Sequence, residues 1–94
     1  MNKYESVILI SNKIKEQERK DIVDKIQKLI SENATLSSIE DAGEKTLAYE
    51  IKKHKKAFYY FINFEANSGF IDELHRNYRI MEKIIKFITF KKDN

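Results

Sequence analysis

GEKTLAYEIKKHKKAFYYFINF, residues Gly43–Phe64, is the stretch that decides the fold of this chain. The stretch begins inside a long, half-polar strand predicted over residues 35–51. It continues through a lysine-rich loop at 52–56 and ends in an aromatic strand predicted over 57–65. Gly43 lies inside the first strand, where a glycine predicts a bulge or bend. No residues in the stretch are arranged for catalysis. A small domain built this way is expected to hold an acidic partner rather than transform a substrate.

The remaining segments complete a β-α-β-β-α-β order. Residues 3–10 are predicted to form a strand and residues 16–33 an amphipathic helix. A second helix of about ten residues is expected to begin after a cap at Asn67 or Ser68, and residues 84–90 form a final strand. This order predicts an α+β, ferredoxin-like sandwich, with a four-stranded antiparallel sheet and two helices on one face. Strands one and three should be central, and the 94 residues should form one domain.

The composition argues against several classes of protein. There is no cysteine, which removes disulfides, thiolate metal sites and cysteine nucleophiles. No apolar run approaches the roughly 18 residues of a membrane span, and no signal-peptide pattern is present, so a cytoplasmic location is expected. His54 is predicted to be a solvated loop residue and His75 a surface or helix-end residue, without metal-ligand spacing. We expect no enzymatic activity, no metal and no cofactor.

Positive charge is concentrated in two segments, although the formal net charge is only +3. Residues 45–56 carry five lysines against one glutamate, and residues 76–92 carry six lysines and arginines against one glutamate. Segregated positive charge is typical of a protein with an acidic partner, and a solvated lysine-rich surface is the alternative. The candidate phosphate contacts are Lys3, Lys45, Lys52, Lys53, Lys55, Lys56, Arg79, Lys83, Lys86 and Lys91.

Apolar side chains point to both faces of the predicted strands. Ile8 and Ile10 alternate with Val7 and Leu9, although a sheet with helices on one face should be mostly polar on the other. In the final strand, we expect Ile85 and Phe87 on one face, with Ile84, Ile88 and Phe90 on the other. An apolar open face predicts a covering partner. The candidate partner contacts are Tyr4, Glu5, Val7, Leu9, Tyr59 and Phe61.

A family resemblance covers the chain from about residue 3 to residue 92. It is carried by Tyr4-Glu5, Gly43, Lys45, Leu47-Ala48-Tyr49, Ile51, Lys53, Phe64-Glu65 and Arg79-Ile80. With this spacing the chain resembles the bacterial-type ribosomal protein six family of the small subunit. The resemblance implies a structural protein that binds the central domain of 16S ribosomal RNA together with ribosomal protein eighteen, as a heterodimer. That partner would cover the open apolar face.

The resemblance also ranks individual residues. Arg79 is the strongest candidate for a phosphate contact, because it matches a family position and arginine can grip a phosphate through two hydrogen bonds. Tyr49 is expected in the core, with stacking or partner contact as the alternative. Ala57 stands where the family often has glycine, so the loop at 52–56 is expected to close differently.

Two other interpretations remain open. The RNA-recognition motif shares this element order and stacks bases on aromatic residues of its central strands, but Lys56–Phe61 matches its pattern weakly. A small regulatory or ligand-binding ferredoxin-like module, acting as a homodimer, is the alternative function. RNA affinity that falls steeply with salt distinguishes an RNA-binding protein from a protein-only adaptor, and a stable homodimer would favour the regulatory module.

Overall fold

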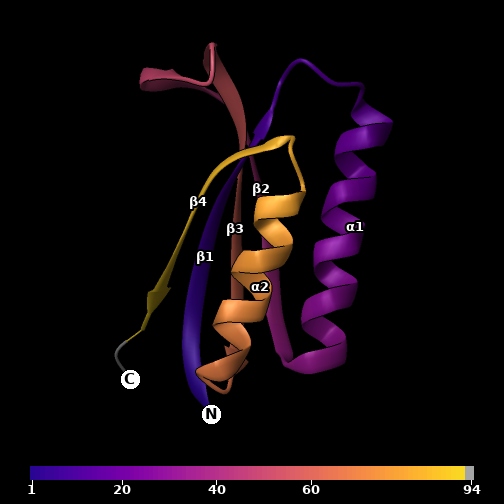
Figure 1. Cartoon of the computed structure of the whole chain (residues 1–94), viewed down its shortest axis with the longest axis vertical. Helices are drawn as coiled ribbons and strands as arrows, with labels where there is room; N and C mark the ends of the chain where they lie inside the picture. The colour runs from indigo at the N-terminus through magenta and orange to yellow at the C-terminus, as the bar shows by residue number, and fades with distance from the viewer. Residues whose placement is uncertain (93–94) are drawn as a thin grey trace.

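The chain folds as two helices packed on one face of a four-stranded sheet (Figure 1). A computed structural model describes residues 1–92. The sheet order is β2-β3-β1-β4, and every neighbouring pair is antiparallel, so the predicted ferredoxin-like fold with β1 and β3 at its centre is confirmed. The elements are β1 Asn2–Ser11, α1 Glu16–Asn33, β2 Thr35–Ile51, β3 His54–Ala66, α2 Gly69–Ile80 and β4 Ile84–Lys91.

Each helix buries a stripe of residues spaced by four. In α1, the stripe is Ile22, Ile26 and Ile30, and the observed helix bounds are those predicted. In α2 the stripe is Phe70, Leu74 and Tyr78, and Ile71 is partly buried beside the core. Neither helix is long and apolar enough to cross a membrane, within the residues that the structure describes.

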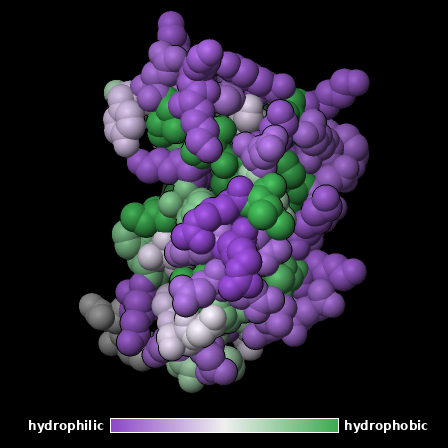
Figure 2. Space-filling view, viewed as in Figure 1, coloured by the Kyte–Doolittle hydropathy of each residue, from purple (hydrophilic) through white to green (hydrophobic). Residues whose placement is uncertain are grey.

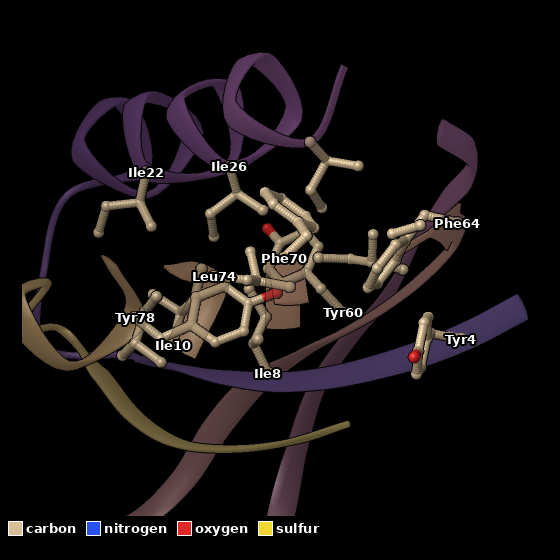
Figure 3. Packing of buried hydrophobic residues seen from close by; sticks show 14 residues of the cluster. Tyr4, Ile8, Ile10, Ile22, Ile26, Tyr60, Phe64, Phe70, Leu74 and Tyr78 are labelled. Carbon is tan, nitrogen blue, oxygen red and sulfur yellow. The ribbon is translucent and has the colours of Figure 1, made fainter. Parts of the chain in front are cut away.

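The main core lies between the helices and the even-numbered residues of β1. Figure 3 shows Ile22 and Ile26 of α1 pointing toward Ile8 and Ile10 of the sheet. Tyr4 belongs to the same face, is 6% exposed, and stacks on Phe64 with ring centroids 5.6 Å apart. The prediction that Tyr4 contacts a partner on the open face is therefore wrong. Side chains alternate between the two faces along β1, and the ring of Tyr4 lies on the face that the helices cover.

The β2–β3 hairpin closes with a turn of only two residues, Lys52 and Lys53. Ile51 pairs with His54, so β3 begins at His54 and the predicted loop over residues 52–56 is wrong. Ala57 is fully buried inside β3, where it needs no conformational freedom of glycine. The hairpin continues past the helix layer and curls over the start of β4 (Figure 1).

The predicted irregularity at Gly43 is confirmed. The register of β2 against β3 shifts between Asp41 and Gly43, and Gly43 has a φ of 82°, which favours glycine. Its N–H donates to Asp41 Oδ1 at 2.9 Å, which stabilises the bulge. This irregularity lies in the edge strand just before the segment that projects beyond the sheet.

A second bulge overturns the predicted faces of β4. Leu9 pairs with Lys86 and Ile10 with Ile84, so Ile85 is an extra residue between the two pairs. Ile84 joins the core under the helices and Ile85 the cluster on the open face. After the bulge, Phe87 packs on the helix side and Ile88 lines a hollow on the other.

Candidate nucleic-acid and partner interface

The predicted phosphate contacts fall at two ends of the molecule. Lys3 and Lys91 lie at the end of the sheet that carries the N-terminus, where Lys91 pairs with Tyr4. The turn at Lys52 and Lys53 lies at the opposite end, together with the connection between α2 and β4. Lys3 and Lys91 therefore lie at the opposite end of the sheet from the cations around the turn.

Three of the predicted cations border one hollow. Lys52 from the turn, Arg79 from the end of α2 and Lys86 from β4 line a hollow of about 370 Å³, together with Glu82. All three cationic side chains are exposed. Within residues 1–92 the one ion pair joins Lys20 and Glu16 on α1, so no carboxylate neutralises the three cations by direct contact. Such a group is suited to phosphate oxygens.

Other cations extend this region along the hairpin. Lys53 in the turn and Lys55 and Lys56 on β3 are exposed, and Lys83 lies in the α2–β4 connection. Lys13 was missed, because it lies outside both lysine-rich segments; its Nζ donates to the backbone oxygen of Lys53 at 2.8 Å. Figure 2 shows hydrophilic residues over the hairpin tip and the ridge of α1, with apolar patches between them.

The open face of the sheet is apolar in its middle. Val7 pairs with Phe61 on one side and with Ile88 on the other, which forms an apolar row across three strands. In the next row Leu9 lies between Tyr59 and Lys86, and Lys45 Nζ lies 5.8 Å from the centroid of the Tyr59 ring. Lys45, predicted as a phosphate contact, thus lies on this face.

The chain itself covers only part of the apolar surface on the open face. Leu9, Leu47, Ala57 and Ile85 are buried together, and a hollow of about 240 Å³ lies beside them. Ile88 and Phe90 are 48% and 49% exposed. The sequence predicts Ile88 and Phe90 on one face of the strand, but not as partner contacts. Glu5 pairs with both Asn63 and Phe90, so the predicted carboxylate lies at the rim of this surface.

Tyr49 is on the surface, and the prediction that it belongs to the core is wrong. It is 62% exposed and lies near the end of β2, shortly before the turn at Lys52 and Lys53. Lys86 Nζ donates to its hydroxyl oxygen at 2.8 Å. The buried residue of the Leu47-Ala48-Tyr49 motif is Leu47, 8% exposed.

Both histidines serve structural roles. His54 is 8% exposed and hydrogen-bonded to Ser11 Oγ at 2.6 Å, so the prediction of a solvated loop residue is wrong. His75 Nε2 lies 2.8 Å from Thr89 Oγ1, and its ring centroid is 4.9 Å from that of Phe87. Burial lowers the pKa of His75, with a further lowering from Arg79. No group of three or more potential metal-ligating residues is found in residues 1–92.

Comparisons with known proteins agree with this architecture. The family model described as Ribosomal protein S6 matches residues 3–91. Small ribosomal subunit protein bS6 of Alkaliphilus oremlandii is 32% identical over 91 residues, which cover 97% of each chain. The bS6 protein of Porphyromonas gingivalis is 36% identical over 94 residues, covering 99% of this chain and 80% of the relative.

A solved structure gives the same result in three dimensions. The 30S ribosomal protein S6 from Thermotoga maritima superposes with a TM-score of 0.92 at 32% identity, covering 97% of this chain and 87% of that one. The family resemblance predicted from the sequence is thereby confirmed, and these relatives are ribosomal proteins rather than enzymes. The chain belongs to the ribosomal protein S6 family of the small ribosomal subunit.

Proposed function

We propose that this protein binds the central domain of 16S ribosomal RNA together with ribosomal protein eighteen, as a structural component of the small subunit. The observation that carries the proposal is the hollow bordered by Lys52, Arg79 and Lys86. Lys52 is distant in the sequence from Arg79 and Lys86, yet the fold brings the three exposed cations to one hollow without a direct carboxylate contact, which is the electrostatic pattern of a phosphate-binding surface.

The apolar open face supports the proposal of a protein partner. Ile88 and Phe90 remain about half exposed, and Ile88 lines a hollow whose walls include Leu9 and Leu47. An apolar surface with polar and charged neighbours is typical of a protein interface. Ribosomal protein eighteen is therefore expected to cover Val7, Leu9, Tyr59, Phe61, Ile88 and Phe90, with Glu5 at the rim.

Reconstitution from three purified components tests the proposal. The chain, ribosomal protein eighteen and a transcribed central-domain RNA are mixed and separated by size-exclusion chromatography. We expect one complex that contains all three. Failure of the chain to associate with either component would refute the proposal, and a stable homodimer would favour the regulatory-module alternative instead.

Two variants test whether ribosomal protein eighteen binds the open face rather than the helix layer. Ile88→Glu puts a charge in the apolar row and is expected to abolish the complex with ribosomal protein eighteen in the absence of RNA. Ile80→Glu is the matched control, since Ile80 is 72% exposed on α2 and outside the open face. Equal loss of binding in both variants would contradict the assignment of the open face.

A further inference from the structure

The two-residue turn at the tip of the hairpin has an unusual composition. Lys52 has a φ of 46° and Lys53 a φ of 65°. Hairpin turns with two positive φ values normally contain asparagine and glycine, because other L-residues are disfavoured in this region. Two consecutive lysines persist in it only if the surrounding structure holds them there.

His54 supplies one of these restraints. Its Nδ1 lies 2.9 Å from the backbone oxygen of Lys52. A carbonyl oxygen only accepts, so Nδ1 carries the hydrogen, and in the neutral ring Nε2 is the acceptor. Ser11 Oγ, 2.6 Å from Nε2, then donates to it. The buried imidazole therefore has a hydrogen-bond partner at both nitrogens.

Ser11 and Lys13 extend the restraint beyond the hairpin. Ser11 Oγ accepts from the backbone N–H of Lys13 at 3.0 Å, while Lys13 Nζ donates to the backbone oxygen of Lys53 at 2.8 Å. The backbone N–H of Ser11 donates to the oxygen of Lys83, also at 2.8 Å. Hydrogen bonds thus run from the carbonyl of Lys52, through His54 and Ser11, to the connection between α2 and β4.

We propose that His54 is a positioning residue for RNA binding: with Ser11, it fixes the conformation of the Lys52–Lys53 turn and ties that turn to the α2–β4 connection. The chain of hydrogen bonds joins the two segments that place Lys52 and Arg79 at the same hollow. A cation already held near its bound position loses less freedom when it meets a phosphate. This inference rests on the proposed function, because Lys52 is positioned for the RNA.

His54→Leu in the full chain tests the inference, since leucine is of similar size but removes both hydrogen bonds. Ser11→Ala is the second variant in case His54→Leu does not fold; it removes the link between His54 and β1 and the hydrogen bond from the Lys13 amide, but it keeps the bond between His54 and Lys52. NMR measures the turn directly: the intraresidue HN–Hα NOE is strongest at positive φ, and amide exchange at Ser11 reports the bond to Lys83. We expect loss of the strong NOEs at Lys52 and Lys53, and faster exchange at Ser11. An unchanged turn would overturn the inference whether or not the chain binds RNA.

Salt-dependent RNA titration tests the positioning role separately. Every cation is retained in His54→Leu, yet we expect the slope of log K against log salt to fall by about one, the equivalent of one phosphate contact. Lys53→Gly should make the turn less dependent on His54, because glycine adopts positive φ freely, so adding His54→Leu to Lys53→Gly should change the slope less. A disordered turn with unchanged affinity and slope would overturn the positioning role. Absence of RNA binding by the wild-type chain in the presence of ribosomal protein eighteen would refute the proposed function instead, and the NMR result would still decide how the turn is held.

Discussion

Lys86 Nζ lies 2.8 Å from the hydroxyl oxygen of Tyr49, a contact that joins β4 to the projecting part of the β2–β3 hairpin. Lys86 borders both hollows, the apolar one on the open face and the cationic one shared with Lys52 and Arg79. The proposed partner surface and the proposed RNA surface therefore adjoin at this residue.

Lys86→Met is predicted to weaken RNA binding through loss of charge. Methionine keeps the apolar stem of the side chain, so the salt slope for central-domain RNA should fall by about one while the fold is unchanged. Tyr49→Phe removes only the hydrogen bond and should leave the slope as it is. Equal effects of both variants would show that Lys86 acts through the contact with Tyr49.

Leu74→Ala is predicted to destabilise the fold by about 2–5 kcal/mol, because Leu74 is fully buried between α2 and the sheet. Urea denaturation monitored by circular dichroism measures the change in the free energy of unfolding. Ile80→Ala lies on the same helix but is 72% exposed, and it should change that energy by less than about 0.5 kcal/mol. Similar values for the two variants would contradict the placement of α2.

The fold is predicted to lose stability in alkali between about pH 10 and pH 12. Burial raises the pKa of Tyr78 from 10.0 to about 12, so in this range the unfolded chain loses the phenolic proton while the folded chain keeps it. The free energy of unfolding should fall by about 1.4 kcal/mol per pH unit there, with no such contribution below pH 10.

Tyr78→Phe is the control for that alkaline loss. The variant should flatten the decline without abolishing it, because burial also raises the pKa of Tyr60. At neutral pH the substitution should lower the free energy of unfolding by about 1 kcal/mol. Ser6 Oγ loses the Tyr78 hydroxyl, its partner at 3.0 Å, but keeps the hydrogen bond from Thr89. An alkaline slope identical to that of the wild type would contradict the burial of the Tyr78 hydroxyl.

Acid is predicted to weaken the fold through His75. Its pKa is lowered below the ordinary 6.5, chiefly by burial, so as the pH falls through 6.5 the unfolded chain takes up a proton before the folded chain does. The stability that His75 contributes is therefore present above that pH and is lost below it. Thermal melts of wild type and His75→Gln at several pH values should show a smaller acid loss in the variant. An unchanged loss would assign the acid sensitivity to other groups.

The fold could be predicted from the sequence because local patterns and topology agree. The stripe of Ile22, Ile26 and Ile30 marked α1 over its full length, and Gly43 marked the bulge in β2. The bulge at Ile85 had no such signal, since the β-branched pair Ile84-Ile85 fits a regular strand equally well. That one extra residue exchanged the faces of Ile84 and Ile85.

The candidate site was predictable only in part. Charge clustering found Lys52, Arg79 and Lys86, but it also selected Lys3 and Lys91, which the antiparallel order places at the other end of the sheet. Composition alone made His54 appear solvated among lysines. Its burial depends on Ser11, 43 residues earlier, a long-range contact that no local pattern specifies.

The salt dependence of RNA binding tests the central claim most directly. Affinity for central-domain 16S RNA, in the presence of ribosomal protein eighteen, is measured from low to physiological salt for the wild type and for the triple variant Lys52→Ala, Arg79→Ala, Lys86→Ala. The control removes three exposed lysines of α1, by Lys20→Ala, Lys25→Ala and Lys28→Ala, and so changes the net charge equally. We predict that the first triple variant lowers the slope by about two to three and the control by much less, because only bound phosphates release counterions. Equal slopes for the two triple variants would contradict the assignment of the hollow as the RNA-binding site.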